Sequence, residues 1–96
     1  TVGGQDELVF DGGSFALNAN GTLAAQAPTF TPELLLLDVR RDGGGIVLDG
    51  PRAALPASDE AEVYAALVLG IRDYIGKNRF PGAVLGLSGG IDSALT

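Results

Sequence analysis

The stretch Ser88-Gly89-Gly90-Ile91-Asp92-Ser93 decides the fold of this chain and indicates what it binds. It follows the apolar run 83–87 and precedes residues that can open a helix. In a strand, turn and helix of this kind, two glycines let backbone N–H groups approach an anion, and the first turn of the helix adds a partial positive charge. The sequence therefore predicts a phosphate-binding loop in an α/β fold.

This loop lies at the end of the chain, about one helical turn before Thr96. One strand and one helical turn cannot cover both faces of the parallel sheet that such a loop requires. We therefore expect the 96 residues to be a segment of a larger protein that spans a junction between two domains.

Composition excludes several classes of function. The net charge is −6 and the six Lys and Arg residues form no basic cluster, which argues against a nucleic-acid partner. The absence of Cys excludes disulfides and a thiol nucleophile among these residues. No apolar run approaches the length of a membrane span, and the first residues lack a signal-peptide pattern. We expect a soluble, cytoplasmic protein with no membrane partner.

The first forty residues have the pattern of β-structure. Short strand candidates, 7–10 and 14–17, flank a glycine turn, and Asn20-Gly21 is a hairpin signal that leads into a further strand at 22–25. This pattern predicts an antiparallel meander. The apolar run 34–39 predicts a strand buried on both faces, with a helix as the alternative.

The composition changes at Arg40-Arg41-Asp42-Gly43-Gly44-Gly45, where the glycine run favours an irregular linker. A brief strand is possible at 46–48, and prolines keep the segment extended up to Ser58. We place an interdomain linker at residues 41–57.

A helix is predicted after this linker. Asp59 with Glu62 has capping-box spacing, and Ser58 is the alternative cap. Apolar residues recur on one helical face that must pack on something, at Val63, Leu67, Gly70, Ile71 and Tyr74. Gly76 and Asn78 are stop signals. The run Ala83–Leu87 is then expected to form the strand that delivers the loop.

The loop residues divide by chemistry. Gly89 and Gly90 can adopt angles closed to other residues, while the Ser88 and Ser93 hydroxyls can donate to phosphate oxygens. A carboxylate beside a polyphosphate is repulsive unless a cation lies between them, so Asp92 is expected to hold Mg²⁺. The alternative is an ordinary strand-to-helix turn, which also favours Ser, Gly and Asp. No Lys follows the glycines, so this is not a Walker loop.

The string Ser-Gly-Gly-x-Asp-Ser at 88–93 resembles the signature of the PP-loop ATP pyrophosphatases. The flanks at 64–74 and 82–95 resemble the opening of the synthetase domain of glutamine-dependent NAD synthetases, and 2–15 is similar to the late part of their nitrilase-like amidase domain. The resemblance implies the end of a nitrilase-like α/β sandwich at 1–40, the linker at 41–57, and the start of a Rossmann-like nucleotide-binding domain at 58–96.

In that family the carboxylate of deamido-NAD attacks the α-phosphate of ATP, pyrophosphate leaves, and ammonia from glutamine displaces AMP to give NAD. Carried onto this chain, the resemblance implies that the loop binds ATP through the eight residues Gly86, Leu87, Ser88, Gly89, Gly90, Ile91, Asp92 and Ser93, with Asp92 on Mg²⁺. It implies ATP, deamido-NAD and glutamine as substrates. We expect the parent enzyme to be a homo-oligomer.

The chain also departs from the family. The amidase reaction uses a Cys nucleophile that is absent here, and contacts to deamido-NAD would follow Thr96, so we assign no catalytic residue and expect these residues alone to be inactive. Two alternatives stay open. One is another PP-loop ligase of the GMP or asparagine synthetase type; the other is a non-catalytic assembly segment whose 63/67/71 face docks to a partner.

Overall fold

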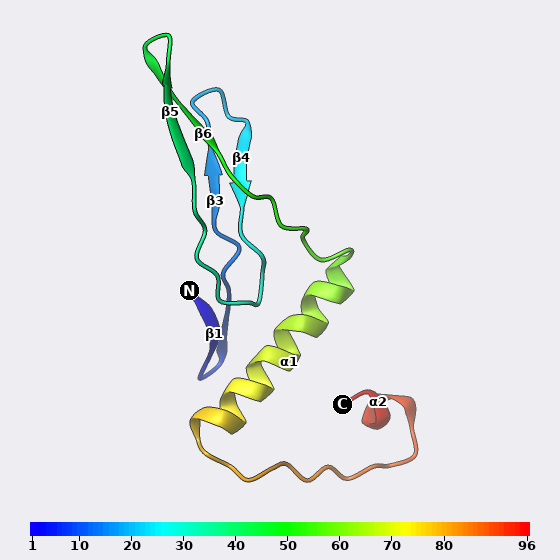
Figure 1. The fold of residues 1–96 in the computed structure, drawn as a ribbon. Helices are drawn as coiled ribbons and strands as arrows, with labels where there is room; N and C mark the ends of the chain where they lie inside the picture. Colours follow the sequence, from blue (N-terminus) through cyan, green and yellow to red (C-terminus); the bar gives the residue numbers. More distant parts are fainter.

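The computed structural model describes residues 1–96 as three β-hairpins followed by two helices, in an elongated molecule of 64 × 28 × 18 Å (Figure 1). The elements in chain order are β1 (Val2–Gln5), β2 (Leu8–Asp11), β3 (Phe15–Leu17), β4 (Leu23–Gln26), β5 (Asp38–Asp42), β6 (Gly45–Asp49), α1 (Asp59–Lys77) and α2 (Ile91–Leu95). Mixed strands and helices agree with the predicted α/β class. A parallel sheet is absent from these 96 residues.

The first four strands form two separate hairpins, so the predicted meander is wrong in its pairing. β2 pairs with β1, which the sequence did not indicate, and β3 pairs with β4. Gly12 and Gly13 separate β2 from β3 and both have positive φ, at 82° and 54°, which redirects the chain. The hairpin signal at Asn20-Gly21 is confirmed, since Gly21 has φ 81° and its N–H donates to Asn18 O at 2.8 Å.

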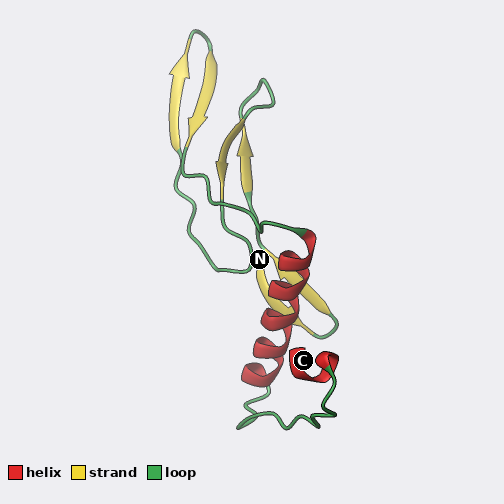
Figure 2. Ribbon diagram, turned by 90° about the vertical axis from the view of Figure 1, so that its right-hand side faces the viewer, coloured by secondary structure: helices red, strands yellow, loops and turns green.

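The glycine run is a hairpin turn, which corrects the prediction of an irregular linker beginning at Arg40. Arg40 and Arg41 lie in β5, which pairs antiparallel with β6. Gly43 and Gly44 have φ of 55° and 99°, and two successive positive φ angles match the twist of a two-residue hairpin. Residues 38–49 are therefore an ordered arm (Figure 2). The division into two domains stays a prediction.

The predicted buried strand at 34–39 is wrong for residues 34–37, and its last two residues lie in β5 but are exposed. β5 begins only at Asp38, and Leu34 and Leu36 are 80% and 72% exposed. No strand lies beside residues 34–37 to complete their backbone hydrogen bonds, so the apolar pattern alone does not produce a strand there.

Helix α1 begins and ends with side-chain and backbone caps. Ser58, the alternative that the sequence offered, is the N-cap and its Oγ accepts from Ala61 N at 3.3 Å, whereas Asp59 is the first helical residue. Asn78 is the C-cap. Arg79 has φ 56°, and Phe80 N donates to Ile75 O at 3.1 Å, which is the hydrogen-bond pattern of a Schellman ending.

The helix packs on the β1–β2 hairpin through a different face from the predicted one. Leu69 is buried, and Gly70 lies against β1 and β2. Of the predicted face, only Gly70 is covered; its large members Val63, Leu67, Ile71 and Tyr74 are all more than half exposed. Leu69 is two residues after Leu67 and so lies on nearly the opposite side of the helix.

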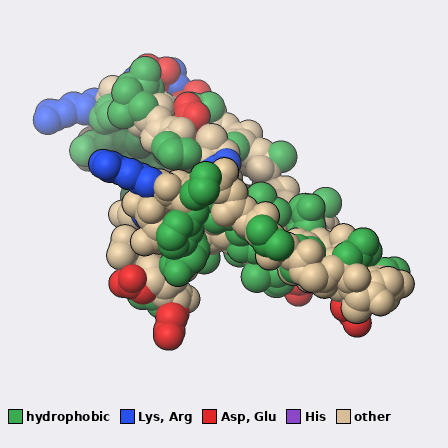
Figure 3. All heavy atoms as spheres, turned by 90° about the horizontal axis from the view of Figure 1, so that it is seen from below, with side chains coloured by type: hydrophobic (Ala, Val, Ile, Leu, Met, Phe, Trp, Pro, Cys, Tyr) green, Lys and Arg blue, Asp and Glu red, His purple; other side chains and the backbone are tan.

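The buried core is small. Its apolar side chains are Ala24, Ala25, Ala27 and Leu69. Apolar side chains occupy much of the face shown in Figure 3, and the exposed ones are spread over strands, helices and connections. The helices do not combine the length and apolar character that crossing a bilayer requires.

The predicted strand at Ala83–Leu87 does not form. The segment between α1 and α2 has no regular structure, and Val84, Leu85 and Leu87 are all exposed. A strand needs a neighbour for its backbone groups, and none of the six strands lies beside it. The helix after the loop does form, as α2.

Candidate functional site

The predicted binding loop, residues 86–93, is open to solvent. Ser93 is half-buried, and the other seven residues are exposed. Residues 86–90 are the end of the irregular segment, and Ile91 starts α2, with Gly90 as its N-cap. The loop carries the turn-to-helix part of the expected layout without the preceding strand.

Two serine side chains hold the turn closed. Ser88 Oγ and Ser93 Oγ lie 2.8 Å apart, and Ser93 Oγ also accepts from Ser88 N at 3.2 Å and donates to Gly90 O at 3.0 Å. Gly90 N approaches Ser88 Oγ at 3.4 Å. The structure therefore brings together two of the predicted phosphate ligands, with Ser93 at the centre of the network.

The backbone N–H groups of the turn are the second feature of the site. Those of Gly89, Ile91, Asp92 and Ser93 donate to no group of the chain. The last three belong to the first turn of α2, where any helix leaves its N–H groups without an intrahelical partner. Such groups can donate to an anion, because each is a hydrogen-bond donor without a competing acceptor.

Only one of the two glycines needs its special conformation. Gly89 has φ 87°, which an L-residue adopts with strain, and a Cβ atom there would meet nothing within 4 Å. Gly90 has φ −86° and ψ 161°, which is ordinary extended backbone. The sequence offered two glycines that can adopt angles closed to other residues, and only Gly89 does so in the structure.

Asp92 is exposed, and its carboxylate makes neither a hydrogen bond nor an ion pair with another side chain. No group of three or more His, Cys, Asp or Glu side chains comes together in the structure. A site with one carboxylate fits Mg²⁺ only where phosphates and water supply the remaining oxygens, which is how this ion is commonly held beside nucleotides. The residues present therefore fit a metal that arrives with a polyphosphate.

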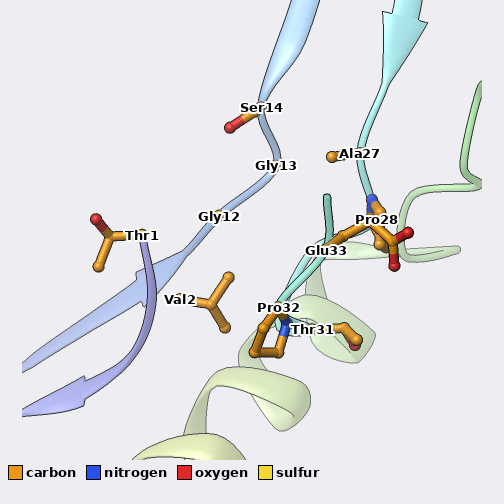
Figure 4. A pocket seen from close by; sticks show the side chains of 10 residues that line it. All are labelled: Thr1, Val2, Gly12, Gly13, Ser14, Ala27, Pro28, Thr31, Pro32 and Glu33. Atoms are coloured by element: carbon orange, nitrogen blue, oxygen red, sulfur yellow. The ribbon is translucent and has the colours of Figure 1, made fainter. Parts of the chain in front are cut away.

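A separate pocket of about 230 Å³ lies between the start of β1, the Gly12–Ser14 turn and residues 27–33 (Figure 4). Its only charged side chain is Glu33. None of the predicted binding residues lines it, so this pocket is not the predicted phosphate site.

A contact that the sequence did not indicate joins α1 to β1. Gly4 N donates to Asp73 Oδ2 at 2.9 Å, and Lys77 Nζ donates to Gly4 O. The two segments are 69 residues apart in sequence. No motif or spacing relates them, and only the fold brings them together.

Comparison with known proteins finds sequence similarity that includes the loop. Residues 63–96 match the family model described as NAD synthase. The chain is 50% identical over 95 residues to a glutamine-dependent NAD(+) synthetase of Synechocystis sp. and 47% identical over 95 residues to one of Acinetobacter baylyi. The protein of the same name from Rhodobacter capsulatus is 45% identical over 94 residues.

These matches cover 98%, 99% and 98% of the chain in that order. The chain spans 17% of the length of each of these three relatives. The similarity therefore describes one segment of those proteins.

Proposed function

Because this chain is homologous to a segment of the glutamine-dependent NAD(+) synthetases, we propose that the protein containing it amidates deamido-NAD to NAD at the expense of ATP. The observation that carries the proposal is the turn at 88–93, with four unpaired backbone N–H groups and two paired serine hydroxyls. It lies within the residues that match the NAD synthase family.

In this proposal, residues Gly86 to Ser93 bind the phosphates of ATP. The free N–H groups donate to the β- and γ-phosphate oxygens, and the Ser88 and Ser93 hydroxyls exchange their mutual hydrogen bond for bonds to phosphate. Both hydroxyls reorient in this step, because Ser93 Oγ donates to Gly90 O and Ser88 Oγ donates to Ser93 Oγ in the free turn. Asp92 would hold Mg²⁺ together with the phosphates, and the bound ion would offset their charge.

The proposed reaction has two steps. A carboxylate oxygen of deamido-NAD attacks the α-phosphorus, the bond to the bridging oxygen breaks, and pyrophosphate leaves. Ammonia then attacks the acyl carbon of the adenylylated intermediate, and AMP departs with the former carboxylate oxygen. The role of the loop is to stabilise the departing pyrophosphate, because donors fixed around a leaving group lower the barrier as charge develops on it.

Ammonia would come from glutamine, as the name of the relatives indicates. The chain has no Cys, so a thiol that attacks glutamine would lie elsewhere in the protein. We further propose that α1 opens the synthetase domain, which is supported by the start of the family match at residue 63. Under this proposal residues 1–40 end the amidase domain, 41–57 connect the two, and the enzyme is a cytoplasmic homo-oligomer.

The fate of a labelled oxygen tests this reaction. The full-length protein is incubated with ATP, Mg²⁺, glutamine and deamido-NAD that carries ¹⁸O in its carboxylate. We expect one labelled oxygen in AMP for each NAD formed, together with one pyrophosphate. The same assay with Ser93→Ala is expected to form labelled AMP more slowly.

Label in inorganic phosphate would indicate activation by the γ-phosphate and would overturn adenylylation. Absence of NAD with both glutamine and ammonium would overturn the synthetase proposal itself. The relatives favour the NAD synthetase over a GMP or asparagine synthetase, and replacing deamido-NAD by XMP or aspartate in this assay is expected to give no product.

A further inference from the structure

The contact between β1 and α1 is a two-point clamp on the backbone N–H and C=O of one residue, Gly4. Asp73 Oδ2 accepts from Gly4 N at 2.9 Å, and Lys77 Nζ donates to Gly4 O. Asp73 and Lys77 are one turn apart on α1 and form an i,i+4 ion pair at 3.8 Å. Acceptor and donor are thereby presented on one helix face at the spacing of a backbone N–H and C=O.

Close packing surrounds the clamp. A Cβ at Gly4 would lie 3.1 Å from Gly70 Cα, and one at Gly3 would lie 2.8 Å from Asp73 Oδ2. Gly3 and Gly4 are buried, as is Leu69 on the neighbouring turn of α1. The Asp73 side chain retains only 22% of its exposure. Charge-assisted hydrogen bonds in partly buried surroundings are stronger than exposed ones, so the clamp fixes the position and rotation of α1 on the hairpin.

The position of the clamp in the chain gives it a further consequence. β1 lies within 1–40, the segment proposed to end the amidase domain, and α1 leads through residues 78–90 to the phosphate loop. The clamp therefore joins the glutamine-using part to the ATP-using part. This step rests on the proposed function: ammonia released from glutamine in one part has to reach the acyl-adenylate in the other. The fraction of ammonia lost to solvent then depends on how firmly the two parts are held together.

We propose that Asp73 and Lys77 are positioning residues that couple glutamine hydrolysis to NAD synthesis by holding α1 against Gly4. Neither side chain contacts the phosphate loop in the structure. Their removal is therefore expected to affect nitrogen transfer and to leave ATP binding and the use of free ammonium unchanged.

The test compares nitrogen sources in the full-length protein. For Asp73→Ala and Lys77→Met, we expect NAD formation with glutamine to fall roughly tenfold, the factor that corresponds to one lost hydrogen bond to a charged group. Formation with saturating ammonium stays at the wild-type rate, and more glutamine is hydrolysed per NAD formed. Asp73→Asn keeps an acceptor for Gly4 N and is expected to restore part of the coupling.

Glu62→Ala is the matched control, because Glu62 is an exposed carboxylate of α1 whose side chain makes no hydrogen bond or ion pair; its ratio of the two activities is expected to match wild type. Amide hydrogen exchange at residues 2–5 provides a second measurement, with faster exchange in Asp73→Ala. Equal loss with both nitrogen sources, or no loss in either variant, would overturn the coupling. A wild-type protein that makes no NAD from either source would overturn the proposed function instead, and exchange at Gly4 would still report whether the clamp exists.

Discussion

Ser88 Oγ and Ser93 Oγ lie 2.8 Å apart and close a turn whose neighbouring backbone N–H groups have no partner in the chain. The pairing satisfies both hydroxyls while the turn is open to solvent. Gly89, between the two serines in sequence, has a φ of 87°.

The first prediction concerns the unequal roles of these serines. Ser93 Oγ contacts Ser88 N, Ser88 Oγ and Gly90 O, so Ser93→Ala removes both a phosphate ligand and the support of the turn. We expect ATP binding by the full-length protein, measured by calorimetry, to weaken more than tenfold in Ser93→Ala and about tenfold in Ser88→Ala. Ser14→Ala, outside the loop, is the control, and equal affinities in all three variants would contradict this role.

The conformation of Gly89 gives the second prediction. A Cβ there meets no atom within 4 Å, but φ is 87°, and the left-handed conformation costs an L-residue about 1 kcal/mol. Gly89→Ala is expected to weaken ATP binding by about fivefold, whereas Gly82→Ala, which has open space and no positive φ, leaves it unchanged. Comparison with Gly90→Ala separates the effect of backbone strain from that of an added methyl group in the loop, since the φ of Gly90 is one that alanine adopts without strain.

Asp92 gives a prediction that depends on the metal. With Mg²⁺ present, Asp92→Asn is expected to weaken ATP binding about tenfold because a ligand oxygen with full charge is lost. Without Mg²⁺ the same change is expected to leave binding unchanged or tighter, because a carboxylate beside phosphates is repulsive. Asp59→Asn, in the first turn of α1, serves as the charge-matched control. The same effect of Asp92→Asn with and without the metal would contradict the assignment.

Two glycines of α1 should respond in opposite directions. A Cβ at Gly76 meets nothing, whereas one at Gly70 lies 3.2 Å from Val9 Cγ2. Gly76→Ala is expected to stabilise the protein by about 1 kcal/mol through helix propensity. Gly70→Val places a branched side chain against β2 and is expected to destabilise the protein by about 1–3 kcal/mol. Thermal unfolding of the full-length protein measures both, and stabilisation by Gly70→Val would contradict the packing described.

The cap of α1 predicts a pH dependence. Hydrogen bonds from the Ser58 side chain and from its own backbone lower the pKa of Glu60 below its usual value. Because the pKa of Glu60 is lower in the folded state, its ionised carboxylate stabilises the fold at pH values above the unfolded-state pKa of about 4.5. This stabilisation is lost as the pH falls through the folded-state pKa. Ser58→Ala should therefore speed amide exchange in residues 59–64 more at neutral pH than below the folded pKa of Glu60. An effect of Ser58→Ala that does not change with pH would contradict a role of the Glu60 carboxylate in stabilising this end of α1.

Local signals predicted the parts of the fold that depend on local chemistry. Ser58, Asn78 and the Asn20-Gly21 turn act within a few residues of themselves, and each lies where the sequence indicated an end or a turn. Strands depend on a partner, which periodicity does not identify. For that reason strands were predicted at 34–39 and 83–87, whereas residues 34–37 and 83–87 are irregular and, apart from the half-buried Leu35, exposed.

The candidate site divides in the same way. The six residues of the turn are contiguous, and the sequence predicted that the Ser88 and Ser93 hydroxyls can donate to phosphate. It did not predict the hydrogen bond that these two hydroxyls form with each other. The contact of Asp73 with Gly4 could not be predicted, because it joins segments 69 residues apart and uses a backbone group that any residue carries. The glycine run at 43–45 misled for a related reason, since the same composition suits a flexible linker and a tight hairpin turn.

A crystal structure of the full-length protein with ATP and Mg²⁺ tests the central claim most directly. We predict β- and γ-phosphate oxygens within hydrogen-bond distance of the N–H groups of Gly89, Ile91, Asp92 and Ser93, with the Ser88–Ser93 hydroxyl pair opened and both hydroxyls on phosphate. A triphosphate bound elsewhere, with the two serine hydroxyls still bonded to each other, would contradict the account.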